Sequence, residues 1–379
     1  MATSQNNKKK VFVGLSGGVD SSVSAALLKE QGYDVTGVFI KTWHPDFLPC
    51  TWKEDRLDAM RVAAHLDIPF LTFDFEKEYK EDVADYMIAE YRKGRTPNPD
   101  VMCNKYVKFG AFLDQAREMG ADFVATGHYA QKKAAETLTG RGEEEDGEKT
   151  YELFAGADKE KDQTYFLWTL PQKKLQSVLF PVGAFQKSHV RELARKFALP
   201  TAERKDSQGV CFLGALNMRE FLENFIPSKK GDVLDESGRV IGEHEGALFY
   251  TFGQRHGFTV TQQSDERKPL YVVGKNLEQN TLTVSESKIS EKRNFREARL
   301  SNVNWISDIP EEGKTILARF RYRQPLQKVQ IRIENGAGGE TMRVFFEEPQ
   351  ESWAPGQSLV VYDPTGEKCP GGGVLEFES

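Results

Sequence analysis

Residues 11–22, near the start of the chain, constrain the fold more than any other stretch. They read VFVGLSGGVDSS, and four of the five residues in 11–15 are apolar, which is typical of a buried strand in a parallel sheet. A glycine turn follows at Gly17 and Gly18, and residues 21–31 read as a helix with an apolar face. A strand, a glycine turn and a helix N-terminus in this order aim backbone N–H groups at an anion.

The side chains of this turn indicate which anion it binds. Ser16, Ser21 and Ser22 offer hydroxyl donors, and the carboxylate of Asp20 beside a phosphate makes most sense if Mg²⁺ lies between them. Neither Gly-Lys-Ser/Thr nor Gly-x-Gly-x-x-Gly is present, which excludes a Walker loop and a Rossmann dinucleotide loop. The string SGGVDSS resembles the pyrophosphate (PP) loop of ATP pyrophosphatases, which split ATP into AMP and pyrophosphate.

Composition and charge narrow the class of protein. No apolar run approaches the ~20 residues that a membrane helix needs, so we expect a protein without a membrane segment, located in the cytoplasm or in an organelle matrix. The net charge of −6 argues against a protein that coats nucleic acid without specificity. The four cysteines are far apart and form no Cys-x-x-Cys pair, which favours free thiols and gives no zinc signature; we expect no resident metal site.

The order of the expected elements predicts an α/β fold followed by two β-rich units. Strands at 35–41, 70–73 and 123–126 alternate with helices at 53–66, 76–92 and 99–119, which predicts a doubly wound parallel sheet. Further helices are expected at 171–179 and 186–197, and the acidic, glycine-rich residues 140–147 read as an exposed hairpin tip or a disordered insert. We expect domains at 1–213 (PP-loop ATP pyrophosphatase domain), 214–288 (small, β-rich central domain) and 289–379 (C-terminal β-barrel).

Alternating residues in the last unit predict about six short strands that close into a small barrel. Arg319, Arg321 and Arg323 are placed on one face of an expected strand, with Tyr322 on the other. A row of arginines would form a phosphate-binding ridge, and the alternative is an ordinary solvated strand face.

A second informative stretch, residues 94–109, reads GRTPNPDVMCNKYVKF. Two prolines stiffen the loop, and Asn98 and Asp100 can cap the helix that follows, so Cys103 is expected near a helix N-terminus. The helix dipole and nearby basic side chains would lower the pKa of the Cys103 thiol. Those basic side chains are Arg95, Lys105 and Lys108. The alternative is a buried structural cysteine beside a cap.

Two weaker signals follow. Cys211 comes two residues after Gly209, which allows a mobile turn, although a small core residue is the plainer interpretation. His128 follows the expected strand 123–126, at the edge of the sheet where ligands bind, and either contacts a substrate or only satisfies its own hydrogen bonds.

Taken together, the motifs resemble the tRNA-specific 2-thiouridylases, a family of PP-loop enzymes that thiolate the wobble uridine of certain tRNAs. The resemblance rests on motifs that occur in order along nearly the whole chain: SGGVDSS, GRTPNPD, MCNK, ATGHY, KDQ, KDSxGxCF, GQR, RYRQ and PGQS. It implies a sulfurtransferase that adenylates the uridine C2 oxygen with ATP and then replaces that oxygen with persulfide sulfur.

The resemblance also implies roles for particular residues. In catalysis, Cys211 is similar in position to the family's persulfide carrier, Cys103 to its nucleophile, and Asp100 to its acid/base group. ATP with Mg²⁺ would bind at Gly14, Leu15, Ser16, Gly17, Gly18, Val19, Asp20, Ser21, Ile40 and Gly127. The tRNA would bind at Asn98, Pro99, Asp100, His128, Lys161, Asp162, Gln163, Arg321, Tyr322 and Gln357. The implied partners are tRNA and a cysteine desulfurase or sulfur-relay protein that supplies the persulfide sulfur.

Two other classes of protein remain open from the sequence. A PP-loop synthetase that adenylates a small molecule would need neither the two thiols nor the arginine-rich barrel. A tRNA-binding protein without catalysis would bind tRNA with a steep salt dependence but release no pyrophosphate.

Overall fold

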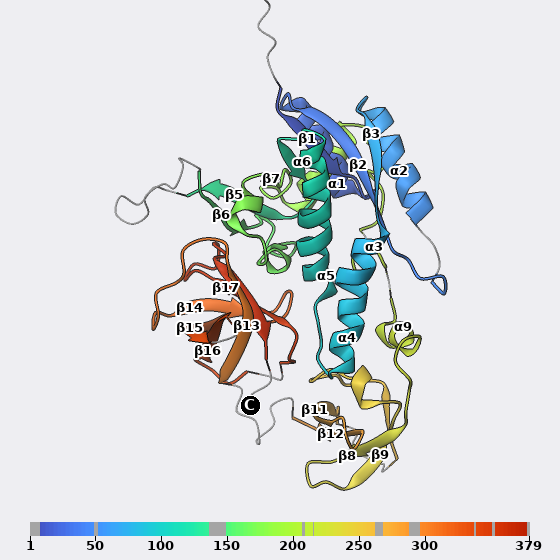
Figure 1. Cartoon of the computed structure of the whole chain (residues 1–379), viewed down its shortest axis with the longest axis vertical. Helices are drawn as coiled ribbons and strands as arrows, with labels where there is room; N and C mark the ends of the chain where they lie inside the picture. The colour runs from blue at the N-terminus through green and yellow to red at the C-terminus, as the bar shows by residue number, and fades with distance from the viewer. Residues whose placement is uncertain are drawn as a thin grey trace, which may run out of the picture.

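A five-stranded parallel sheet in the order β3-β2-β1-β4-β7 organises the N-terminal part of the chain (Figure 1). The computed structural model describes residues 8–48, 52–135, 149–206, 209–214, 216–261, 268–287, 296–336, 339–350 and 353–376. The strands of the sheet are β1 Lys10–Gly14, β2 Asp34–Thr42, β3 Phe70–Phe75, β4 Phe123–Ala125 and β7 Val178–Leu179. All four pairs of neighbouring strands are parallel, as predicted.

Alternate residues of β1 face opposite layers of the domain. Val11 and Val13 pack with apolar residues of helices α1 Val19–Glu30 and α2 Trp52–His65. Phe12 lies on the other face, in the cluster that contains Phe112 and Leu113 of helix α6 Phe112–Glu118. Because β1 is buried on both faces, its sequence is almost continuously apolar, and the doubly wound arrangement is confirmed.

The two long helices predicted at 76–92 and 99–119 form, but each contains a π-helical turn. The first consists of α3 Glu76–Tyr79, the π-helix η1 Lys80–Asp85 and α4 Tyr86–Arg92. The second consists of α5 Pro99–Met102, the π-helix η2 Cys103–Ala111 and α6, with non-helical torsion angles at Gly110. π-Helical turns inside α-helices are rare and frequently occur at functional sites.

The structure corrects one predicted helix in this domain. Residues 171–179 form only the short helix α7 Gln172–Leu175 and then the edge strand β7, which pairs with β4. Helix α8 Lys187–Lys196 follows as expected. Strands β5 Ala130–Ala134 and β6 Tyr151–Ala155 form an antiparallel hairpin, but its expected tip at 140–147 lies outside the described residues.

The two C-terminal units are rich in β-structure, as predicted. The middle unit joins helix α9 Met218–Glu223 to a five-stranded sheet in the order β10-β9-β8-β12-β11. Its strands are β8 Gly231–Leu234, β9 Val240–His244, β10 Phe258–Val260, β11 Tyr271–Asn276 and β12 Thr281–Ser285. Short 3₁₀ turns lie at Thr164–Phe166 and Ala247–Phe249.

Six strands close the C-terminal barrel in the order β13-β16-β15-β14-β17-β18, with every neighbouring pair antiparallel. They are β13 Glu297–Trp305, β14 Ile316–Arg319, β15 Gln327–Gly336, β16 Gly339–Phe346, β17 Ser358–Tyr362 and β18 Gly371–Leu375. The barrel packs against the sheet domain: Asn304 donates to the carbonyl of Trp168 (2.7 Å), and Cys369 N–H donates to the carbonyl of Leu153 (2.8 Å). Within the described ranges, no helix has the length and apolar character needed to cross a membrane.

Candidate functional site

The glycine turn at 14–18 connects β1 to the N-terminus of α1, as the sequence predicts. Gly18 is the N-cap of α1, and no side chain caps the helix there, so the first turn is open to an anion. Gly17 has a φ of +75°, which a residue with a side chain adopts only at a cost. Ser16 is exposed, whereas the hydroxyls of Ser21 and Ser22 donate to the carbonyl of Gly18 (3.1 and 2.7 Å). Two of the three expected hydroxyl donors therefore hold the turn in shape.

Gly127 and Ile40 lie beside this turn, at the carboxyl ends of β4 and β2. A Cβ atom on Gly127 would lie 2.7 Å from the backbone nitrogen of Ser21, so only glycine allows this approach to the helix N-terminus. The side chain of Ile40 is buried, and its Cδ1 lies 3.9 Å from where a Cβ on Gly14 would be. The ten residues expected at the ATP site thus form one continuous group around the start of α1.

Asp20 has partners that the sequence did not suggest. Lys187 Nζ donates to both carboxylate oxygens of Asp20 (2.7 and 2.9 Å), and the hydroxyl of Tyr129 donates to one of them (2.7 Å). Lys187 is the first residue of α8 and lies 167 positions from Asp20, so no local pattern points to it. It places an ammonium group beside the turn, which is the kind of group that the missing Walker lysine would supply.

This pairing tests the expectation that Asp20 holds Mg²⁺. Its charge is already balanced by Lys187, and among the described residues no group of three His, Cys, Asp or Glu side chains could hold a metal. A lysine from a distant helix occupies the place expected for the ion in this structure, and the role of Asp20 as a Mg²⁺ ligand stays a prediction.

Lys187 also connects the turn to the segment that carries Cys211. Its Nζ lies 2.9 Å from Asp206, which also pairs with Lys161 and Arg191 (2.8 Å each). Partial burial would raise the pKa of Asp206, but Lys161 and Lys187 outweigh it and lower this pKa to about 2. Arg204 donates to the carbonyl of Gly17 (3.0 Å), so the same segment also touches the glycine turn directly.

The two cysteines that the sequence singled out lie together. The Sγ atoms of Cys103 and Cys211 are 3.6 Å apart, although 108 positions separate the two residues. Asp100 Oδ1 accepts the backbone N–H of Cys211 (2.8 Å), and the hydroxyl of Tyr79 donates to the Cys211 carbonyl (2.7 Å). Both thiols are free, and Cys50 lies outside the described residues. Asp100 and Tyr79 therefore hold the backbone on both sides of the Cys211 side chain.

The sequence predicted a lowered pKa for the Cys103 thiol. In the structure the pKa of Cys103 is raised, and it is the pKa of Cys211 that is lowered. Burial, together with its hydrogen bond to Cys211, raises the pKa of Cys103 well above its ordinary value. The hydrogen bond from Cys103 and the charge of Lys108 lower the pKa of Cys211 to about 7, despite its partial burial. The expectation for Cys103 was wrong because its side chain is fully buried, and burial outweighs the helix dipole.

The loop before these residues is held by all three units. Asn98 is the N-cap of α5 as predicted, and its side chain accepts the N–H of Val101 (3.3 Å). Arg95 pairs with Glu90 and with Glu376 of the barrel, so it does not face the thiols. Thr96 donates its N–H to the carbonyl of Pro355 (2.7 Å) in the barrel unit.

The middle unit also contacts this loop. The hydroxyls of Thr96 and Thr251 are 3.0 Å apart, and Lys275 Nζ donates to the carbonyl of Gly94 (2.9 Å). The loop 94–98 that leads to Asp100 and Cys103 therefore contacts the sheet domain, the middle unit and the barrel.

The residues expected to contact tRNA fall into buried and surface positions. His128 is buried, hydrogen-bonds to Thr126 (2.7 Å) and contacts the ring of Phe109; burial and then the charge of Lys108 lower the pKa of its imidazole. Gln163 accepts the N–H of Tyr129 (3.0 Å). Asp162 is 3% exposed and Lys161 pairs with Asp206, so these side chains are engaged within the protein.

The remaining expected contacts come from the barrel unit. Arg321 donates to the carbonyl of Phe252 (3.3 Å) in the middle unit, and the ring of Tyr322 packs on Phe166. Gln357 accepts the N–H of Ala354 (3.2 Å) within its own turn. Arg321 and Tyr322 thus lie where the barrel meets the two other units.

The expected ridge of Arg319, Arg321 and Arg323 does not form. Strand β14 ends at Arg319, so the next residues follow a turn rather than a strand, and Arg323 has a φ of +63°. Arg319 points into the protein and donates to Asp162 (2.6 Å) and to the hydroxyl of Tyr362 (2.8 Å). The prediction was wrong because the buried carboxylate of Asp162 takes this arginine.

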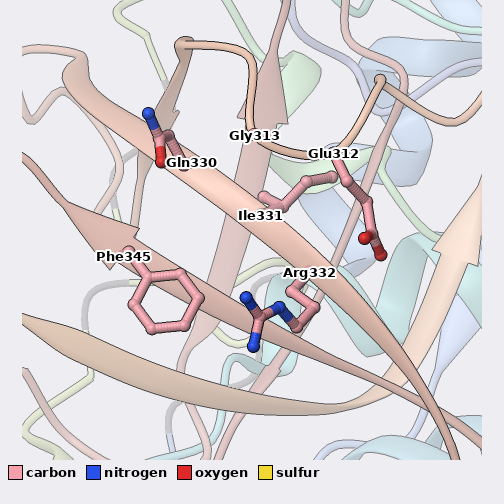
Figure 2. Close-up of a pocket in the computed structure, with 6 residues that line it drawn as sticks. All are labelled: Glu312, Gly313, Gln330, Ile331, Arg332 and Phe345. Carbon is pink, nitrogen blue, oxygen red and sulfur yellow. The ribbon is translucent and has the colours of Figure 1, made fainter.

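A hollow on the barrel is unrelated to these sites. It has a volume of about 280 Å³ and is lined by residues of the 312–313 loop, β15 and β16, as Figure 2 shows. Gln330, Arg332 and Phe345 are among its lining residues, and none of the expected site residues is. The candidate site is therefore defined by the turn at α1 and the thiol pair.

Comparisons with known proteins identify the family of this chain. The chain matches the tRNA methyl transferase HUP domain over residues 9–215, the tRNA methyl transferase PRC-barrel domain over 219–286 and the aminomethyltransferase beta-barrel domain over 295–375. It is 48% identical over 375 residues to the tRNA-specific 2-thiouridylase MnmA of Streptococcus thermophilus, covering 98% of this chain and 96% of that protein. The corresponding protein of Streptococcus mutans is 47% identical with the same coverage.

Among solved structures, a 4-thiouridine synthetase in complex with RNA and bound ATP is similar to part of this chain. The identity is 20%, the TM-score is 0.33, and the similarity covers 58% of this chain and 50% of that chain. The two Streptococcus proteins match this chain at higher identity and over more of its length than this structure does. The chain belongs to the family of tRNA-specific 2-thiouridylases.

Proposed function

We propose that this protein uses ATP to thiolate the C2 position of the wobble uridine in tRNA. The membership of the family supports the reaction, and the glycine turn and the thiol pair supply the two chemical steps that it needs. The observation that carries the proposal is the 3.6 Å separation of the Cys103 and Cys211 sulfurs beside the Asp100 carboxylate. An enzyme that only adenylates a small molecule has no use for this pair.

The first step activates the uridine. ATP binds with its phosphates at the N-terminus of α1, where Lys187 can pair with them, and with its nucleoside near Ile40 and Gly127. The uridine C2 oxygen attacks the α-phosphorus, the bond to pyrophosphate breaks, and the oxygen becomes part of an AMP leaving group. When ATP binds, Lys187 would turn from Asp20 to the phosphates, and the Asp20 carboxylate would then hold the Mg²⁺ that accompanies them.

The second step replaces that oxygen with sulfur. Cys211 carries a persulfide whose outer sulfur attacks C2, and AMP leaves. Cys103 then attacks the Cys211 sulfur, the bond between the two sulfurs of the former persulfide breaks, and 2-thiouridine is released. A Cys103–Cys211 disulfide remains for reduction, and the 3.6 Å separation means that about 1.5 Å of movement brings the sulfurs to the bond length of about 2.05 Å.

Asp100 is the acid/base group of this proposal. Burial raises the pKa of its carboxyl despite the hydrogen bond from Cys211 N–H, which moves its titration towards neutral pH. Asn98 and Pro99 precede it on the loop held by all three units, so we place the target base there. The other expected contacts, including Arg321 and Tyr322, would meet more distant parts of the tRNA, and a cysteine desulfurase or relay protein would deliver the sulfur.

The test uses three matched cysteine variants of the full chain. Protein, ATP, unmodified tRNA and a low-molecular-weight persulfide are incubated, and 2-thiouridine is measured by mass spectrometry of tRNA digests. C103A and C211A should each lose the product and still release pyrophosphate when tRNA is present. C369A removes a buried thiol outside the site and should keep the product. Product formation by C103A or C211A at the wild-type rate would refute the role of that cysteine.

A further inference from the structure

The π-helix η2 places Lys108 on the same side of the helix as Cys103. In an α-helix, residues five positions apart point about 140° away from each other. The wider i→i+5 turn of a π-helix brings them nearly into line, and η2 spans Cys103–Ala111. Lys108 is half-buried, and its Nζ lies 5.7 Å from the ring centroid of Phe212, the residue after Cys211. The unusual turn thus directs an ammonium group to the segment that carries the second thiol.

Four titratable groups from three helical elements lie near Cys211. They are Tyr79 on α3, Asp100 on α5, and Cys103 and Lys108 on η2. Lys108 is the one cation among them. Burial opposes the charge of Lys108, but the nearby Cys211 and Cys103 sulfurs hold the pKa of this lysine above its ordinary value.

The other basic side chains of this stretch are directed elsewhere. Arg95 is bound to Glu90 and Glu376, and Lys105 is exposed with its Nζ 4.9 Å from the ring centroid of Tyr106. Three lysines and arginines that look equivalent in the sequence therefore have different environments. The one whose charge acts on the two thiols is Lys108 of η2, which lies over the ring of Phe212.

We propose that Lys108 is a catalytic residue of sulfur transfer, in which its ammonium group is the counter-charge of the Cys211 sulfur. The proposal rests on the function proposed above. In the loading step, the Cys211 thiol loses its proton to water, and the thiolate attacks the outer sulfur of a donor persulfide. The S–S bond of the donor breaks, the donor leaves as a thiolate that takes up a proton, and Cys211 holds the persulfide. Lys108 stabilises the negative sulfur at the start of this step.

A salt bridge to Asp100 is the plainer role for a half-buried lysine. Asp100, however, accepts the N–H of Cys211, and burial raises its pKa even with Lys108 nearby. A lysine that served only this carboxylate would leave the reactivity of Cys211 unchanged when its charge is removed. The two roles therefore predict different pH dependences for the reaction of the Cys211 thiol once the charge of Lys108 is removed.

The experiment follows the reaction of Cys211 with iodoacetamide as a function of pH, by peptide mass spectrometry on the full chain. The wild-type rate should rise with pH through a midpoint near 7, because only the thiolate reacts. K108M and K108Q should move the midpoint upwards by about one unit, which lowers the rate at pH 7 about fivefold. K108R keeps the charge and should restore the wild-type midpoint, and K105M is the matched control on the same helix.

Sulfur loading from a small persulfide should fall in parallel in K108M and K108Q, and K105M should load sulfur like the wild type. An unshifted midpoint in K108M and K108Q, equal to that of K105M, overturns the proposal for Lys108. K108Q keeps a polar head of similar length, so it tests the charge even if K108M does not fold. Failure of the proposed function has a different signature, which is wild-type protein that releases no pyrophosphate and forms no 2-thiouridine.

Discussion

The buried pair of Asp162 and Arg319 gives the sharpest prediction about how the barrel is attached. Asp162 belongs to the sheet domain and is 3% exposed, and Arg319 at the end of β14 is 9% exposed. The carboxylate accepts Arg319 Nη2 (2.6 Å), the hydroxyl and N–H of Thr164 (2.9 and 3.2 Å) and the N–H of Gly156 (3.1 Å). We consider the substitution R319M, which removes the charge and keeps most of the side-chain volume.

The expected loss follows from what remains around Asp162. Three neutral donors stay in place, but the carboxylate loses its counter-ion in a site that water does not reach. Removing one partner of a buried ion pair costs about 3–5 kcal/mol, because the other charge is left uncompensated. The three remaining donors place the expected loss at the lower end, about 3 kcal/mol.

Urea unfolding followed by tryptophan fluorescence measures this loss. The matched control is K328M, which breaks the exposed pair of Lys328 and Glu347 on the same barrel and should cost less than about 1 kcal/mol. D162N/R319M should lose less than the sum of the two single variants, because neither charge is then left alone. A loss for R319M no larger than that for K328M, or strict additivity in the double variant, would refute this account of the interface.

Three further predictions concern the catalytic site. K187M should raise the KM for ATP about tenfold or more in a pyrophosphate-release assay, because a charge-assisted hydrogen bond to phosphate is lost; an unchanged KM would contradict the placement of Lys187. G127A should weaken ATP binding measured by calorimetry, because its Cβ would lie 2.7 Å from Ser21 N; wild-type affinity would contradict the close approach. Y79F removes the donor to the Cys211 carbonyl and should slow 2-thiouridine formation about five- to tenfold, with pyrophosphate release unchanged; equal effects on both would indicate a general loss of structure.

The sequence predicted those parts of the molecule that depend on local pattern. The apolar run of β1, the glycine turn and the alternation in the barrel each express a requirement of one element, and each was confirmed. The cap at Asn98 was confirmed for the same reason. Pattern also brought Cys103 and Cys211 to notice, but the short distance between their sulfurs depends on the tertiary fold.

The differences come from tertiary contacts that a local pattern does not show. Lys187 pairs with Asp20, Asp162 draws Arg319 into the interior, and residues 178–179 form β7 because they pair with β4. Complete burial overrides the dipole at Cys103. The partner of Asp20 lies 167 positions away, and that of Arg319 lies 157 positions away in another unit.

Because residues 94–98 contact all three units, the domains of this protein are hard to exchange, either by engineering or by recombination in evolution. A sheet domain expressed alone would keep its nucleotide turn, but the loop that leads to Asp100 would lose Thr251 and Lys275 on one side and Pro355 and Glu376 on the other. Transplanting a foreign barrel to change tRNA preference would therefore have to carry over the last two contacts as well. Recombination at the domain borders is constrained in the same way. The three units are separate in fold, but they cannot be exchanged independently without losing contacts to this loop.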